Sequence, residues 1–119
     1  GLGSSNRIFV GTGGSNDILK IWAGTTLAGN TNVAGNWSYG HAVFNGTSSS
    51  HDFTDGTNSS TASGNAGTNG SNGLTVGTLY TAASDFWQGE MAEIIMYGKE
   101  VTGDELTGLR SYLESKWGF

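Results

Sequence analysis

Hydrophobic positions are densest in one stretch near the C-terminus, residues 86–97. Between Met91 and Tyr97 only Glu93 is charged, and bulky side chains fall on both alternating faces. A strand that is apolar on both faces is normally covered on both sides. Glycines bracket this run, which favours a strand over the helix that the composition alone would also allow. We therefore predict an inner strand over residues 91–97.

The residues that follow predict a helix over about 103–116. Thr102 and Glu105 have the spacing of a capping box. Apolar residues then recur at helical spacing, at Leu106, Leu109, Leu113 and Trp117. Gly118 suits the end of a helix. We expect this apolar stripe, its tryptophan included, to pack in the core against the 91–97 strand.

Further strands are predicted upstream, over residues 7–10, 17–23, 37–44 and 74–76, with an edge strand around 57–62. Alternation along the chain indicates those at 17–23 and 37–44. Asn45-Gly46 predicts a tight type I′ turn, and the return strand after it is expected over 49–54. Residues 24–36 are predicted to be mostly loop. Strands followed by one terminal helix predict an all-β fold, an antiparallel β-sandwich with one C-terminal α-helix.

Composition narrows the classes of function. The 119 residues make one domain, 1–119, and with 21 glycines the core must come from a few apolar strands. A net charge of −5 disfavours nucleic acid and anionic membrane surfaces as partners. The chain has no cysteine, so it forms no disulfide and offers no thiolate. Its apolar runs are too short for membrane insertion.

The stretch from Gly89 to Tyr97, followed by residues 113–118, resembles the C-terminal part of concanavalin A-like (laminin-G-like) jelly-roll domains of bacterial and phage proteins. That family reads roughly G-E-I-A-E-I-I-I-Y and then K-W-G at these positions. Residues 44–47 and 73–77 are similar to two upstream motifs of the family. The resemblance implies a jelly roll on a virion or outside the cell, as in tail, fibre, decoration and adhesion proteins. A complete domain has more strands, so we expect the chain to be the later part of a longer domain, completed by strands from elsewhere.

An enzyme is not expected. Glycosidases need two carboxylates that flank one bond, whereas Glu90 and Glu93 are three residues apart and would point to opposite faces of a strand. The resemblance implies that Glu93 is structural and hydrogen-bonded beneath the helix or a loop. His41 and His51 lie beside turn-rich segments and do not complete a nucleophile's triad.

We predict a binding module that recognises a glycan or a host-surface receptor, because lectin sites combine aromatic faces with polar loop groups. The candidate ligand-binding residues are Trp37, Tyr39, Asp52, Asp55, Asn58 and Trp87. Asp52 and Asp55 are also candidate ligands for Ca²⁺, although an Asp-Gly turn explains them equally. Tryptophans in a thin sandwich are usually core. The alternative function is a structural virion decoration or assembly protein that contacts other virion or surface protein chains.

Overall fold

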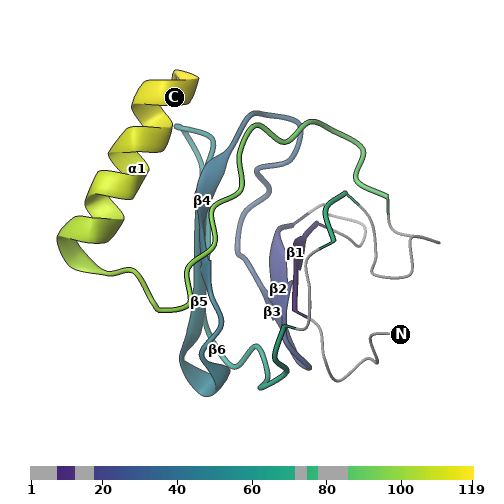
Figure 1. The fold of residues 1–119 in the computed structure, drawn as a ribbon. Coiled ribbons are helices and arrows are strands. Elements are labelled where there is room, and N and C mark those ends of the chain that lie inside the picture. The colour runs from purple at the N-terminus through teal and green to yellow at the C-terminus, as the bar shows by residue number, and fades with distance from the viewer. Residues whose placement is uncertain (1–7, 13–17, 72–74, 78–85) are drawn as a thin grey trace.

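The structure, a computed structural model, describes residues 8–12, 18–71, 75–77 and 86–119. Within these ranges the chain forms two three-stranded antiparallel sheets and one C-terminal helix. This confirms a mostly β fold with a terminal helix. Figure 1 shows three layers: the helix, the sheet of β4, β5 and β6, and the sheet of β1, β2 and β3.

The first sheet consists of three-residue strands in the order β1-β2-β3. They are β1 (Phe9–Gly11), β2 (Lys20–Trp22) and β3 (Thr26–Ala28). Strands are confirmed within the predicted stretches 7–10 and 17–23, but they are shorter than the second prediction and β1 is shifted to Phe9–Gly11. The prediction that 24–36 is mostly loop missed β3. Gly24, at φ 111°, lies in the bend that returns the chain beside β2.

The second sheet has the order β4-β5-β6 and longer strands. They are β4 (Tyr39–Val43), β5 (Ser49–Thr54) and β6 (Ser59–Gly64), as expected for 37–44, 49–54 and the edge strand. The predicted type I′ turn is wrong, because a 3₁₀ turn, η2 (Gly46–Ser48), joins β4 to β5. The Ser49 hydroxyl stabilises that turn by donating to the Gly46 carbonyl and accepting from the Asn45 N–H.

The buried core is small and lies around β2. Its apolar members among the described residues are Leu19, Ile21, Ala23, Val33 and Ala66. The Ala66 carbonyl accepts hydrogen bonds from the N–H groups of Ala23 and Thr25, at 2.6 and 3.0 Å. The face of the second sheet that meets Gly29 is polar, since His51 and Ser60 are buried there. The two sheets therefore meet over little apolar surface.

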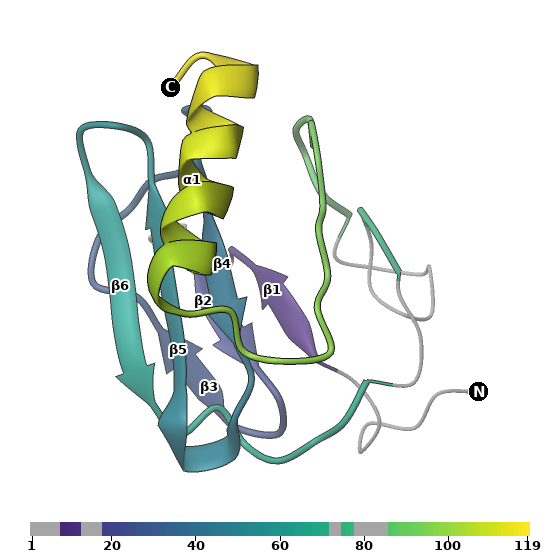
Figure 2. The same ribbon diagram turned by 60° about the vertical axis from the view of Figure 1, so that its left-hand side comes forward.

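The prediction of a covered inner strand at 91–97 is wrong. The structure assigns no strand there, and the chain runs extended past β4 without pairing to it (Figure 2). Exposed fractions are 40–57% at Met91, Ile94, Ile95, Met96 and Tyr97. A strand exchanges main-chain hydrogen bonds with a neighbour on at least one side, and no such bond joins residues 91–97 to another described residue. The strand expected at 74–76 is likewise not formed at Thr75 and Val76, while residue 74 lies outside the described ranges.

The predicted helix is confirmed as α1 (Gly103–Trp117), which ends at Gly118 in the left-handed region, φ 79°. The capping box is wrong: the Thr102 side chain makes no capping bond, and Glu105 instead pairs with Lys99 at 2.9 Å. No residue of α1 is buried, and Trp117 is 44% exposed rather than in the core.

Polar contacts hold α1 to the rest of the molecule. Arg110 donates to Asp52 of β5 at 2.9 Å, and the Tyr39 hydroxyl of β4 bonds to Glu114. The 91–97 segment meets the helix through Glu93, which accepts hydrogen bonds from three side chains: Tyr112, Lys116 and Trp117. The helix and this segment thus join as expected, but through a carboxylate instead of an apolar seam.

Candidate functional site

A hollow of about 520 Å³ is lined by residues of the β5–β6 turn and of the chain end after α1. Its lining residues are Asn36, Trp37, Asp55, Thr57, Asn58, Gly118 and Phe119. Three of the predicted ligand-binding residues, Trp37, Asp55 and Asn58, therefore come together although they lie up to 21 positions apart.

Asp55 organises the polar side of this hollow. One carboxylate oxygen accepts the main-chain N–H groups of Thr57 and Asn58 at 2.9 and 2.6 Å. The other oxygen accepts the side-chain amides of Asn36 and Asn58 at 2.9 and 3.3 Å. These donors, the Asn58 N–H foremost, hold the pKa of Asp55 well below its usual range. Asp55 is thus a fixed anion that orients two carboxamides.

The carboxamides remain able to bind a ligand. An amide side chain has two N–H donors and one carbonyl acceptor. Asn36 and Asn58 each use one N–H to donate to Asp55. A second N–H and an oxygen are left on each. Such paired donors and acceptors suit vicinal hydroxyl groups.

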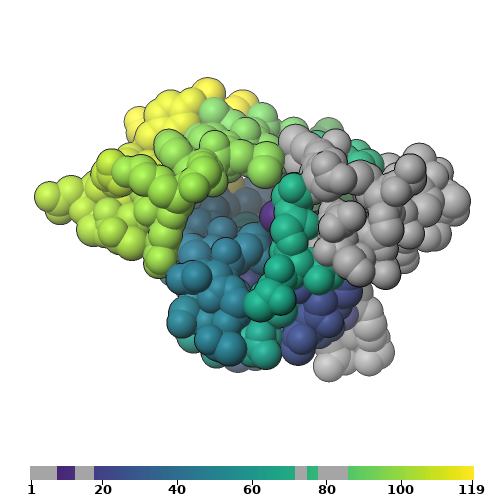
Figure 3. Space-filling view, turned by 60° about the horizontal axis from the view of Figure 1, so that its bottom comes forward, coloured from purple at the N-terminus to yellow at the C-terminus, as the bar shows by residue number. Residues whose placement is uncertain are grey.

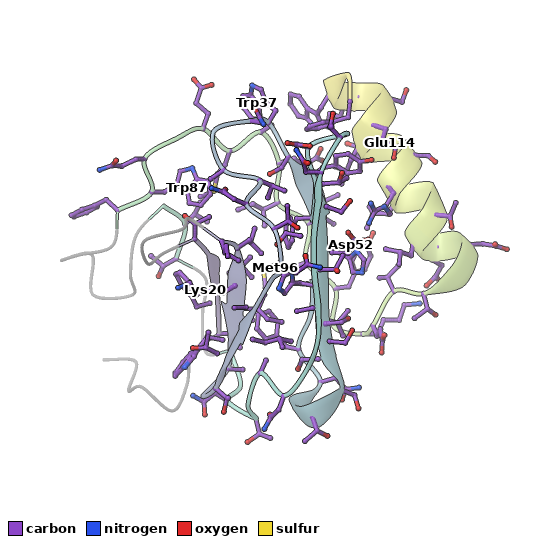
Figure 4. All side chains as sticks on the ribbon, turned by 180° about the vertical axis from the view of Figure 1, so that it is seen from behind. Lys20, Trp37, Asp52, Trp87, Met96 and Glu114 are labelled. Carbon is purple, nitrogen blue, oxygen red and sulfur yellow. The ribbon has the colours of Figure 1, made fainter. Side chains whose placement is uncertain are left out.

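The aromatic side of the hollow is formed by Trp37 and Phe119. The Trp37 residue is 56% exposed and lies at the open end of the sheet (Figure 4). Phe119 packs on Tyr39 with a ring-centroid distance of 4.6 Å. The Glu114 carboxylate, which accepts from the Tyr39 hydroxyl, raises the pKa of Tyr39. Tyr39 thus packs against Phe119, which lines the hollow, but does not line the hollow itself.

The other two predicted ligand-binding residues lie elsewhere. Asp52 faces α1, where it pairs with Arg110, and borders a separate hollow of about 340 Å³ with His41 and His51. Trp87 lies away from Trp37 in Figure 4, and its main-chain N–H donates to the Gly77 carbonyl at 2.7 Å. A site that combined all six residues is therefore not formed.

The two candidate calcium ligands serve different partners. Asp52 binds a guanidinium group, and both oxygens of Asp55 accept N–H donors. Calcium requires several oxygen ligands around one point, and within the described ranges no three His, Asp or Glu side chains gather to hold a metal. This donor set does not fit a calcium ion shared by the two carboxylates.

Of the two carboxylates considered for catalysis, Glu93 has a structural role. Trp117 donates its indole N–H to Glu93 at 2.9 Å and, with Tyr112 and Lys116, lowers the pKa of Glu93. Glu93 is therefore held as an anion against the helix, the structural role that the resemblance implied. Burial lowers the pKa values of His41 and His51, which keeps both rings neutral.

Sequence reasoning did not single out four lining residues, Asn36, Thr57, Gly118 and Phe119. The spacing of Asp55, Thr57 and Asn58 does carry a signal, because an Asp side chain often accepts N–H groups two and three positions onward in a turn. Asn36 is brought in by a contact 19 positions away and Phe119 by the docking of α1. Neither contact has a local pattern.

No protein family, curated protein or solved structure matches this chain. The resemblance to concanavalin A-like domains therefore stays a prediction. Of the helices in the described ranges, none has the length and apolar character to cross a lipid bilayer.

Proposed function

We propose that this chain is a non-enzymatic binding module that holds a glycan in the hollow between Trp37 and Asn58. The observation that carries the proposal is the meeting of an exposed indole face with two oriented carboxamides. An aromatic face covers the apolar side of a sugar ring, and the amides exchange hydrogen bonds with its hydroxyls. Rigid loops on a sheet scaffold are a common place for such sites.

The negative charge held on Asp55 favours a neutral or weakly polar sugar as the ligand. The oxygens of Asp55 already accept four N–H donors, so this carboxylate acts by positioning Asn36 and Asn58. A strongly anionic glycan would meet Asp55 and the chain's net charge of −5. Neutral hexoses and N-acetylhexosamines fit this chemistry better.

The proposal extends to the fold and the location. Two facing antiparallel sheets and a C-terminal helix are consistent with a β-sandwich of the concanavalin A-like jelly-roll type. We place such a module on a virion or on an extracellular surface protein, where it would meet a glycan-bearing receptor.

A glycan array followed by calorimetric titration with the best neutral glycan tests the proposal. Trp37→Ala should weaken binding by about ten-fold or more, since burying a large side chain contributes roughly 1.5–3 kcal/mol. Trp87→Ala is the matched control, because Trp87 is also exposed, at 40%, but does not line the hollow. Absence of array signals, or an equal loss in the two variants, would rule the site out.

A second candidate is a structural assembly protein, and one observation favours it. The extended segment 86–97 leaves apolar side chains in water, and large exposed apolar patches mark protein–protein contacts. An assembly protein would show no glycan affinity and would bury this segment against another chain.

A further inference from the structure

The apolar surface of segment 86–97 is large for a chain that stays alone. Seven of its residues have exposed fractions between 40% and 64%: Phe86, Trp87, Met91, Ile94, Ile95, Met96 and Tyr97. At roughly 200 Å² for each large side chain, they leave on the order of 700 Å² of surface uncovered. The largest apolar patch of a typical monomer is ~300–600 Å², and a stable interface buries ~800 Å² per partner. The exposed apolar area of the segment is therefore close to what one partner buries in a stable dimer interface.

The backbone of the segment determines what kind of partner fits. No main-chain hydrogen bond joins residues 91–97 to another described residue. Unpaired N–H and C=O groups along an extended chain are a template for another strand. Figure 3 shows the surface hollowed between this part of the chain and the second sheet. A strand partner would satisfy the main chain and cover apolar side chains together.

We infer that the partner is a second copy of this chain, paired antiparallel through residues 91–97 about a two-fold axis at Ile94. This centre is the self-register that pairs all seven residues. It sets Ile94 opposite Ile94 of the second copy and Met91 opposite its Tyr97, and such apolar cross-strand pairs stabilise a sheet. The interface is isologous and closes at two chains. This interface shares no residue with the Trp37 hollow, so the dimer can be tested independently of glycan binding.

Charge opposes this dimer weakly. Each chain carries −5, and Glu93 of the two copies lie diagonally across the pair. Lys116 offsets Glu93 at 3.2 Å in each chain. The apolar area is thus the driving term, and salt should tighten the dimer by screening the repulsion.

Sedimentation equilibrium of the full chain, from micromolar to hundreds of micromolar, tests the inference. We expect twice the 12.3 kDa chain mass at the upper end. Ile94→Lys should weaken the dimer at least about ten-fold, because it sets two ammonium groups opposite each other. Val10→Lys is the control, since Val10 is exposed to a similar degree, 44% against 49%, on β1. A chain that stays monomeric throughout, or an equal loss with Val10→Lys, would overturn the inference.

Disulfide trapping tests the register without relying on a loss. The chain has no cysteine, so Ile94→Cys can form a disulfide only between copies. Directly opposed residues have Cα atoms ~4.5–5.5 Å apart, within the range that a disulfide spans. Mild oxidation should cross-link Ile94→Cys far faster than Ser115→Cys, which places the thiol on the exposed face of α1. Equal rates would contradict pairing at Ile94.

Discussion

Two apolar regions of this chain have opposite fates. Ile21 belongs to the three-residue strand β2 and is 0% exposed, whereas Ile94 belongs to the densest apolar run and is 49% exposed. The first is covered because β1 and β3 pair on both sides and the chain near Ala66 closes over its end. The second is hydrogen-bonded to no described strand. Hydrophobicity indicates that burying a segment would be favourable. Whether the segment is buried depends on which strands of the same chain can pair with it.

The largest expected difference between the two regions is in stability. Ile21→Ala should cost roughly 2–5 kcal/mol, because it opens a cavity in a packed site. Ile94→Ala should change the free energy of unfolding by no more than about 0.5 kcal/mol, as surface substitutions do. Urea unfolding followed by circular dichroism at low micromolar concentration measures both. Equal costs would show that Ile94 is buried within one chain.

The contact between the Ala66 carbonyl and the main chain after β2, which closes the core, can be tested next. Gly67 has φ 95°, and a Cβ there would lie 2.1 Å from the Ala23 carbonyl oxygen. Gly67→Ala should therefore cost at least about 1–3 kcal/mol. Gly70→Ala, where a Cβ meets nothing within 4 Å, is the control and should be neutral or slightly stabilising. If both variants unfold at the same urea concentration, the Ala66 contact does not close the core.

Lowering the pH should destabilise the buried part of the fold before it affects the exposed segment 86–97. Burial lowers the pKa of His51 below its ordinary 6.5, so the unfolded chain binds a proton that the folded chain refuses. Stability is then full above about pH 6.5 and falls as the pH drops, by up to about 1.4 kcal/mol per pH unit. His51→Leu should reduce this slope, and His41, whose pKa burial also lowers, supplies the remainder. An unchanged slope in urea titrations of His51→Leu would contradict this assignment.

Salt gives the smallest effect, and only on the exposed region. Raising the ionic strength should tighten the dimer severalfold while leaving the unfolding of the dilute chain nearly unchanged. Sedimentation at low and high salt measures this. A dimer that weakens with salt would mean that ion pairs, not apolar area, hold the two copies together.

Local signals in the sequence predicted the elements that depend on local physics. The turn signal at Asn45-Gly46 located β5, although the turn type was wrong, and the helical spacing of apolar residues located α1 within one or two residues. β3 was missed because Thr26–Ala28 has one large apolar side chain and no alternation to detect. The Asp52–Arg110 pair spans 58 positions, and no local pattern announces it.

The candidate site was predicted in part for the same reason. Trp37, Asp55 and Asn58 were chosen for their chemistry, and the fold brings these three together. Trp87 and Asp52 were chosen on the same grounds, but β5 turns Asp52 toward α1. Side-chain type indicates what a residue can bind, while the pairing of distant strands decides which residues share a hollow.

Amide hydrogen exchange at two protein concentrations shows whether a second copy or the chain itself protects residues 91–97. If a second copy protects them, residues 91–97 exchange rapidly in dilute solution and slowly in concentrated solution, while β5 stays protected in both. Slow exchange of residues 91–97 at every dilution would show that one chain buries this segment by itself and would contradict pairing between copies.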